Sequence, residues 1–319
     1  MKAFIYTKYG LPDALALAEV NKPKPGANNV LVKVQAVSLN ASDWELLTGK
    51  PFYSRVYGLF KPRKHILGSD ISGVVEAVGT QVTKFKPGDE VFGDAFEYFG
   101  GFAEYVCVPE KVMFHKPTYL SFEQAATIPQ AACIALQGIR DKGQIKTGQR
   151  ILINGAGGGS GVFAIQLAKM YGAEVTAVDN ADKQDVMLTA GADHILDYKK
   201  TDFTTNTEKY DFIFDLAAYH SIFDYKRVLA AKGTYTMVGG SMKTVFQTLF
   251  IGSLLSILGR KKYTMLALKK NHDMEHILNL IESGQLRIFI DKHFPFAKTI
   301  EALKYFGAGH AKGKVVINV

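Results

Sequence analysis

The chain has 319 residues, 47% of them hydrophobic, which is enough for two domains that each bury a core. It contains only two cysteines, Cys107 and Cys133, which excludes a disulfide framework and favours a reducing compartment, so we expect a cytoplasmic protein. The net charge is +8, but the basic residues form small separate clusters without interleaved aromatic residues, so we expect no nucleic-acid partner.

The first part of the chain, up to about residue 118, is predicted to be rich in β-strands. Pro- and Gly-containing turns at 22–26 and 86–89 separate short β-branched or alternating segments, a pattern typical of a small barrel. The predicted strands are Ala3–Tyr6, Val30–Val37, Ile71–Val78 and Tyr105–Val108.

The pattern changes after residue 120. Ser121 begins a predicted helix, and from Arg150 onward apolar strands alternate with helices, which is typical of a parallel, doubly wound sheet. Helices are predicted near 160–172, 181–190 and 221–230. The predicted strands are Ile151–Asn154, Glu174–Asp179, His194–Tyr198, Asp211–Leu216 and Thr234–Gly239.

A glycine-dense turn joins the first of these strands to the first helix. It has the spacing Ala156-x-Gly158-x-x-Gly161, with further glycines at 155, 157 and 159, so an alanine takes the place of the first glycine of the usual fingerprint. Such a turn offers backbone N–H groups at a helix N-terminus, where a pyrophosphate binds. The next strand ends at Asp179, about 20 residues beyond the turn, where an acid contacts the ribose of a bound dinucleotide.

The last part of the chain differs again. The apolar segment Lys243–Leu258 precedes Arg260–Lys262, and three roles remain open for it: covering a hydrophobic substrate, packing in a dimer or touching a membrane surface. Its apolar run is shorter than the ~20 residues of a membrane-spanning helix, so we expect no integral membrane segment. A helix at Met274–Glu282 and a final strand at Lys314–Val319 follow, and the strand is predicted to rejoin the first domain.

Taken in order, several motifs resemble the medium-chain dehydrogenase/reductase superfamily, in its zinc-free, quinone-oxidoreductase-like branch. Besides the glycine turn, they are Val37–Asp43, Gly68–Gly79, Phe85–Gly93, Leu188–Tyr198 and Gly309–Val316. The resemblance implies an α/β protein in which a GroES-like β-barrel catalytic domain accompanies a Rossmann domain with a doubly wound parallel sheet. It places the catalytic domain at 1–120 and 263–319 and the nucleotide-binding domain at 121–262, and it implies a homodimer.

The resemblance also argues against zinc. Zinc-dependent relatives have a Gly-His-Glu motif where this chain has Gly68-Ser69-Asp70, and their other catalytic ligands fall near Asn40 or Ala41 and near Gln130. These positions lack the thiolate and imidazole groups that zinc prefers. A His272-x-x-Glu275-His276 spelling matches some zinc proteases, but we interpret it as a solvated helix start.

By resemblance, one set of residues binds the cofactor. Its members are Asn40, Ala156, Gly157, Gly158, Gly159, Ser160, Gly161, Asp179, Lys183, Tyr198, Asp215, Val238, Gly239 and Gly240. Asp179 favours NAD because an acid repels a 2′-phosphate. Lys183, in contrast, falls where NADPH-using relatives bind that phosphate. We therefore expect NAD to be slightly favoured, with NADP as the alternative.

Catalytic candidates are fewer. Asn40, Asp43 and Tyr53 are expected to donate or organise hydrogen bonds to the acceptor, although Asp43 also suits a helix cap and Tyr53 also suits packing. Without zinc to polarise an alcohol or aldehyde, hydride transfer from NAD(P)H to a quinone or an α,β-unsaturated carbonyl is the expected reaction. An alcohol or aldehyde oxidoreductase, and a nucleotide-sensing or RNA-binding protein without turnover, remain alternatives.

Overall fold

The computed structural model describes residues 1–319, which form two compact units. Unit 1 comprises Met1–Gln130 and Ile290–Val319, and unit 2 comprises Ala131–Phe289. The first boundary falls inside helix α3 (Pro129–Leu136). Both boundaries lie C-terminal to the positions 120 and 262 that the resemblance implies.

Specific contacts explain the extent of each unit. Helix α2 (Phe122–Ala126) packs against strands β3 (Asn29–Ser38) and β4 (Asp70–Val78) of unit 1. The Ser72 hydroxyl donates to the Phe122 carbonyl at 2.7 Å. In unit 2, the Gln166 side chain accepts a hydrogen bond from the Arg287 backbone N–H and donates to its carbonyl. The chain therefore stays with unit 2 well beyond residue 262.

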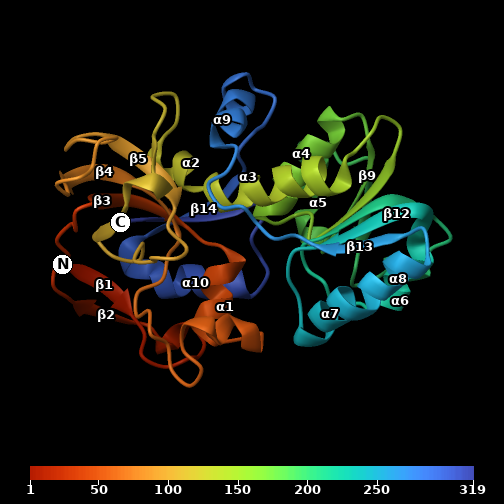
Figure 1. The fold of residues 1–319 in the computed structure, drawn as a ribbon, viewed down its shortest axis with the longest axis horizontal. Coiled ribbons are helices and arrows are strands. Elements are labelled where there is room, and N and C mark those ends of the chain that lie inside the picture. Colours follow the sequence, from red (N-terminus) through yellow and green to blue (C-terminus); the bar gives the residue numbers. More distant parts are fainter. The chain divides into compact units, whose positions relative to one another are not determined.

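Unit 1 is built around one sheet of seven strands (Figure 1). The order is β14-β15-β3-β4-β5-β7, and β6 pairs with β3. Strand β15 pairs antiparallel with β3, with Ile317 opposite Val37, so the C-terminal strand returns to unit 1 as predicted. The strands are β3 (Asn29–Ser38), β4 (Asp70–Val78), β5 (Glu90–Asp94), β6 (Tyr105–Pro109), β7 (Phe114–His115), β14 (Ile290–Pro295) and β15 (Lys314–Asn318).

Two strands and two further helices complete unit 1. Strands β1 (Lys2–Ile5) and β2 (Ala16–Glu19) form an antiparallel pair. Helix α1 (Ala41–Thr48) follows β3 directly and ends at Gly49, and α10 (Thr299–Gly307) precedes β15. The core combines alternating residues of β3, including Val30, Val32 and Val34, with apolar residues of these helices, which is why the strand reads as β-branched in sequence.

Unit 2 contains a six-stranded parallel sheet in the order β10-β9-β8-β11-β12-β13. In chain order this is 3-2-1-4-5-6, the arrangement of a Rossmann fold, as predicted. The sixth strand, β13, was not predicted because it follows a basic run. The strands are β8 (Arg150–Asn154), β9 (Glu174–Asp179), β10 (His194–Asp197), β11 (Tyr210–Asp215), β12 (Leu229–Met237) and β13 (Lys262–Met265).

Helices cover both faces of this sheet, with α4 and α5 on one side and α6 to α8 on the other (Figure 1). The predicted helix Met274–Glu282 is present as α9. No helix is both long and apolar enough to cross a membrane. The helices besides α3 and α9 are α4 (Gly159–Met170), α5 (Gln184–Ala190), α6 (Ile222–Val228), α7 (Met242–Phe246) and α8 (Ser253–Leu258).

Candidate functional site

The glycine turn lies at the carboxyl end of β8, directly before α4. Gly155 has a φ of +80°, which few other residues tolerate. A Cβ on Gly161 would lie 2.4 Å from the carbonyl oxygens of Gly155 and Ala156, so only glycine fits there. A Cβ on Gly158, in contrast, would meet only the Gly155 carbonyl oxygen, at 3.5 Å. The turn is therefore open at Gly158, which precedes a twelve-residue helix. The N-terminus of a helix attracts anions.

Asp179, at the end of the neighbouring strand β9, is bound to this turn. One carboxylate oxygen accepts a hydrogen bond from the Gly157 N–H at 3.0 Å, and the other accepts from the Asn180 N–H at 2.8 Å. The Lys183 ammonium lies 3.1 Å from the same carboxylate, and both side chains are almost fully buried. The two residues that suggested opposite cofactor preferences thus form one ion pair. Asp179 also stabilises the shape of the turn.

A second buried acid, Asp215, ends strand β11. Its carboxylate accepts hydrogen bonds from the Asn154 amide at 2.8 Å and from the Tyr235 hydroxyl at 2.9 Å. Burial raises the pKa of Asp215, although these donors oppose that shift. The Val238 N–H donates to the Asp215 carbonyl at 2.9 Å, so the segment after β12 is held beside the end of β11.

The remaining predicted cofactor residues lie near strand ends of the same sheet. Gly240 forms a parallel bridge with Ala218, just beyond β11. Tyr198 follows β10, is partly exposed and has its ring 6.5 Å from that of Tyr219. Carboxyl ends of parallel strands meet at one edge, which is where doubly wound sheets bind ligands. The structure therefore brings the predicted residues of unit 2 to one edge of the sheet.

Unit 1 contains a separate buried polar cluster around Asn40. The Asn40 amide nitrogen donates to the Ser69 hydroxyl at 3.2 Å, and its amide oxygen accepts from the Lys314 ammonium at 2.6 Å. Lys314 also donates to the Leu39 carbonyl and lies 3.9 Å from the Asp70 carboxylate. The Asn40 amide is thus oriented by groups far away in sequence. Its predicted contact with a cofactor remains a prediction.

The acids of this cluster outnumber its single lysine. Asp70 lies directly opposite Asp94 in the β4–β5 pairing, and one Asp70 oxygen has no hydrogen-bond partner. Burial, followed by the charge of Asp94, raises the pKa of Asp70. Burial likewise lowers the pKa of Lys314, against the opposing effect of Asp70, Asp43 and Asp94. Burial and the charge of Asp94 therefore both favour the protonated form of Asp70.

Asp43 performs a structural task. Its carboxylate accepts hydrogen bonds from the backbone N–H groups of Asn40 at 3.0 Å and Gly68 at 3.1 Å, so it caps α1 and ties the helix to the segment before β4. The side chain is fully buried, and burial raises its pKa to about 7. This geometry favours the helix-cap alternative, and a catalytic role for Asp43 remains a prediction.

Tyr53, the tyrosine predicted at the acceptor, lies in a short 3₁₀ helix, Phe52–Tyr57. Tyr53 is partly exposed there. Tyr57 instead packs edge-on against Phe96 and Phe99 and belongs to the hydrophobic core of unit 1. Of these residues, Tyr53 keeps the better access for a polar contact with a ligand.

The positions equivalent to zinc ligands do lie together in unit 1. Asn40 contacts Ser69, the Gln130 N–H donates to the Asp70 carboxylate, and the Gln130 side chain accepts from Ser42. However, no three His, Cys, Asp or Glu side chains are grouped so that they could hold a metal ion. His272 pairs with Asp273 before α9 begins, so the histidines of the protease-like motif do not share that helix. The donor set does not fit zinc.

Known proteins share both this fold and much of this sequence. Residues 26–118 match the family model of the alcohol dehydrogenase GroES-like domain, and residues 190–317 match the model described as zinc-binding dehydrogenase. The 2-methylene-furan-3-one reductase of Solanum lycopersicum is 34% identical over all of this chain and 79% of its own length. The chain belongs to the medium-chain dehydrogenase/reductase superfamily.

Two further relatives place the chain within this superfamily. The NADPH-dependent alkenal/one oxidoreductase of Arabidopsis thaliana, a chloroplast protein, is 32% identical over 99% of this chain and 79% of its own. The quinone oxidoreductase structure from Coxiella burnetii superposes with a TM-score of 0.87 at 29% identity, covering 100% of this chain and 99% of the other. The chain is a quinone-oxidoreductase-like member of the superfamily.

The sequence did not predict several polar residues at the carboxyl edge of the parallel sheet and around Asn40. They are Ser69, Asp94, Asn154, Asn180, Lys314 and Tyr235. Lys314 and Ser69 lie inside motifs that carried the resemblance, so a lysine within an apolar final strand was an available signal. Asp94 had no such signal, because only the register of β5 against β4 brings it to Asp70.

Proposed function

We propose that this protein uses NADH or NADPH to transfer a hydride to a quinone or an α,β-unsaturated carbonyl compound, without zinc. The observation that carries the proposal is the open glycine turn at Gly158, braced by Asp179, at the start of α4. The relatives, named as reductases or oxidoreductases of enones, alkenals and quinones, support the same cofactor and acceptor classes.

The residues of unit 2 suit a dinucleotide. The turn Ala156–Gly161 would hold the pyrophosphate through the N–H groups at the start of α4, because those of Ala156, Gly157 and Gly158 already donate within the protein. Asp179 and Lys183 would lie at the adenosine ribose and Tyr198 near the adenine. The buried Asn180 amide oxygen has no hydrogen-bond partner within the protein, which fits a ligand hydroxyl beside it. Asp215 and residues 238–240 would adjoin the nicotinamide. The cofactor, once bound, supplies the hydride.

The residues at the positions of the zinc ligands do not suit a metal, which argues for an acceptor that needs no Lewis acid. Quinones and enones spread the incoming negative charge to a distant oxygen, and hydrogen bonds can stabilise that oxygen. We propose that Asn40 provides such a contact, that Asp43 maintains the backbone around it and that Tyr53 is available to protonate the product.

For the cofactor, we propose a slight preference for NAD over NADP. Asp179 and Lys183 neutralise each other in the structure, so a 2′-phosphate must compete with Asp179 for the ammonium group. A free 2′-hydroxyl, in contrast, leaves the ion pair intact.

We also propose that the protein is a cytoplasmic homodimer. Both cysteines are free thiols, which suits a reducing compartment, although some relatives are named as chloroplast proteins. Strand β13 lies at the edge of the parallel sheet, so a second copy can pair with it. Light scattering would measure the assembly, and a monomer at micromolar concentration would contradict it.

An absorbance assay tests the reaction. We expect NADH or NADPH to be consumed with a quinone and an enone but not with a simple aldehyde, and a strong zinc chelator should leave the rate unchanged. Consumption with aldehydes alone would support an alcohol or aldehyde oxidoreductase instead. Salt-sensitive RNA binding without turnover would support a nucleotide sensor.

Gly158→Ala tests the cofactor site. The new Cβ has space in the protein, so folding should be nearly unaffected, but it occupies the open side of the turn and should raise the KM for the cofactor at least roughly tenfold. Gly26→Ala is the matched control, because its Cβ also has space and lies in unit 1. An unchanged KM in Gly158→Ala would contradict the assignment.

A further inference from the structure

The side chain of Gln137 holds a part of the backbone that lies 132 residues away along the chain. Gln137 begins a π-helical turn, Gln137–Gly143, directly after α3, and its side chain is buried. Its amide oxygen accepts a hydrogen bond from the Lys269 N–H at 2.9 Å, and its amide nitrogen donates to the Lys269 carbonyl at 2.8 Å. Both polar groups of a buried amide are thus used on the backbone of one residue, which fixes the chain at Lys269.

The helical turn that carries Gln137 is itself fixed against the parallel sheet. A Cβ on Gly138 would lie 2.1 Å from the ring of Phe214, a buried residue of β11, so only glycine lets the turn pack this closely. Arg140 on the same turn pairs with Asp273 at 2.6 Å. The turn therefore has two attachments to the segment between β13 and α9. π-Helical turns of this kind are frequent at functional sites.

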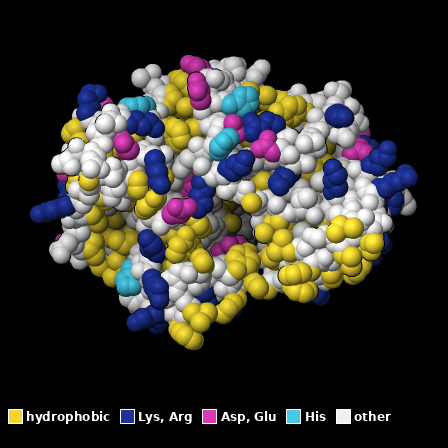
Figure 2. Space-filling view, in the orientation of Figure 1, with side chains coloured by type: hydrophobic (Ala, Val, Ile, Leu, Met, Phe, Trp, Pro, Cys, Tyr) yellow, Lys and Arg dark blue, Asp and Glu magenta, His cyan; other side chains and the backbone are white.

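The attached segment, Leu266–Asp273, starts at the carboxyl end of β13 and runs to α9 (Figure 1). Figure 2 shows Lys, Arg and His side chains along its course, so one side of the segment faces solvent. The Leu266 N–H donates to the Met237 carbonyl at 2.8 Å, whereas the backbone groups of Ala267 and Leu268 have no hydrogen bond within the protein. Two peptide groups at this edge of the sheet are therefore available to a ligand.

The strand order places these free peptide groups where a nicotinamide would lie. Asp179, at the proposed adenosine ribose, ends β9, which lies on one side of β8 together with β10; β11, β12 and β13 lie on the other side. A dinucleotide that crosses the glycine turn with its adenosine at β9 therefore extends its nicotinamide towards the ends of β11 to β13. The nicotinamide carries a carboxamide, which donates and accepts hydrogen bonds as a peptide group does.

We propose that Gln137 is a positioning residue for hydride transfer, because by fixing Lys269 it presents the backbone of Ala267 and Leu268 to the nicotinamide carboxamide. The inference rests on the proposed function, since it requires a dinucleotide at this edge of the sheet. Both polar groups of Gln137 are used on Lys269, so Gln137 acts through the backbone that it holds and not on the cofactor directly. Loss of this contact leaves the adenosine half bound and the nicotinamide poorly oriented.

Calorimetry with NAD and with ADP-ribose, which lacks the nicotinamide, tests this proposal. Gln137→Met has a similar length but neither hydrogen-bonding group, so it should weaken NAD binding roughly tenfold, leave ADP-ribose binding within about twofold and lower kcat about tenfold. Gln137→Glu keeps an acceptor for the Lys269 N–H and should show a smaller loss in the same direction. Gln285→Met is the matched control, because Gln285 is an exposed glutamine of unit 2.

The two nucleotides separate the outcomes. A purely structural role of Gln137 would weaken both, so equal losses of NAD and ADP-ribose affinity in Gln137→Met would overturn the proposal. Unchanged NAD affinity and kcat in both Gln137 variants would overturn it as well. If the unmodified chain binds neither nucleotide, the proposed function itself fails, and the role of Gln137 fails with it.

Discussion

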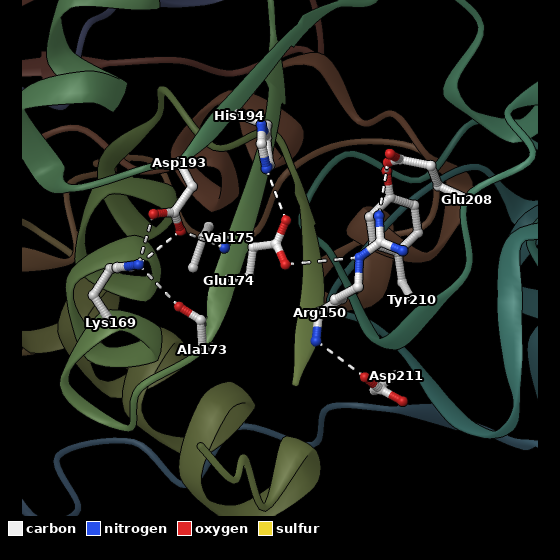
Figure 3. Close-up of polar contacts among 10 residues, drawn as sticks. All are labelled: Arg150, Lys169, Ala173, Glu174, Val175, Asp193, His194, Glu208, Tyr210 and Asp211. Carbon is white, nitrogen blue, oxygen red and sulfur yellow. Dashed lines mark hydrogen bonds and ion pairs between the residues drawn. The ribbon is translucent and has the colours of Figure 1, made fainter. Parts of the chain in front are cut away.

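The two edges of the parallel sheet in unit 2 use similar side chains in opposite ways. At the carboxyl edge, Asp179 and Asp215 are buried, and each carboxylate holds backbone or side-chain donors in place. At the amino edge, Arg150 lies 3.0 Å from Glu208 and 3.8 Å from Glu174, and Glu174 also pairs with His194 (Figure 3). Most of these partners are at least one-third exposed.

Burial makes the difference between the edges. A charge in water gains little from a partner, since solvent already stabilises it, whereas a buried carboxylate without donors is strongly unfavourable. The carboxyl edge is therefore expected to be rigid and sensitive to substitution, and the amino edge tolerant. This contrast suits a protein that binds its ligand at only one edge of the sheet.

The largest difference in stability is expected between substitutions at the two ends of one strand, β11. Asp215→Ala leaves the Asn154 amide and the Tyr235 hydroxyl buried without their acceptor, so we expect a loss of about 4 kcal/mol in the free energy of unfolding. Asp211→Ala, at the amino end, removes only an acceptor for the Arg150 N–H and should cost less than about 1 kcal/mol. Urea denaturation measures both, and equal losses would break the comparison.

The buried cluster of unit 1 extends the comparison to a lysine. Lys314→Met removes the donor that orients the Asn40 amide and the cation beside Asp70, so we expect about 2 kcal/mol lower stability and roughly tenfold lower kcat. Lys312→Met is the control, because Lys312 is exposed two residues away. A stability loss with unchanged kcat would show that Asn40 needs no such orientation.

At the carboxyl edge, a substitution can test the ion pair between Asp179 and Lys183. Asp179→Ser frees Lys183 and removes the negative charge, so the ratio of kcat/KM for NADPH to that for NADH should rise about tenfold, equivalent to about 1.4 kcal/mol. Asp182→Ser changes an exposed neighbouring acid and should move the ratio much less. An unchanged preference in Asp179→Ser would contradict our assignment of the ribose site.

The pH dependence of stability distinguishes the fully buried Asp43 from the partly buried, ion-paired Asp273 by the sign of the slope. Because the pKa of Asp43 is raised to about 7, the native state binds more protons than the unfolded state above about pH 4. Its contribution should therefore fall as pH rises from about 4 to about 7, by at most about 1.4 kcal/mol per pH unit. Asp43→Asn should remove this slope, measured by urea denaturation at each pH.

Asp273 provides the opposite case. Hydrogen bonds from Arg140 lower its pKa to about 2, so its contribution is present above about pH 4 and is lost as pH falls towards 2. Asp273→Asn should thus change the slope only in acid. If both variants altered the same pH range, burial would not explain the difference between them.

The smallest effect is expected at the amino edge. Arg150→Gln should cost less than about 1 kcal/mol in the free energy of unfolding, and added salt should shrink the loss further. A loss above about 2 kcal/mol would show that the network in Figure 3 behaves as a buried one.

Much of the fold could be predicted from the sequence, because parallel strands buried on both faces have continuous apolar sequences. Strands β8 and β9 were predicted to within one residue for this reason. Strands β13 and β14 were not, since both carry exposed charged residues along an edge of their sheet. The glycine turn was predictable because its chemistry is local, lying within a few residues of its helix.

The polar clusters were less predictable. Asp179 was predicted as a ligand-binding acid, but its bond to Gly157 N–H depends on how two adjacent strands end. Asn40 was predicted from its motif, whereas the lysine that orients it lies 274 residues away along the chain. Neither spacing nor composition carries information about contacts that arise only when separate strands pair.

The order of amino acids was sufficient for the alternation of strands and helices, the glycine turn and the family, because these depend on neighbours within one turn or one strand. Folding alone decided which acids are buried, which lysine compensates them and which face of Met242–Leu258 points to solvent. Those outcomes depend on dielectric environment and packing, and both are properties of the assembled sheet and helices rather than of any local segment.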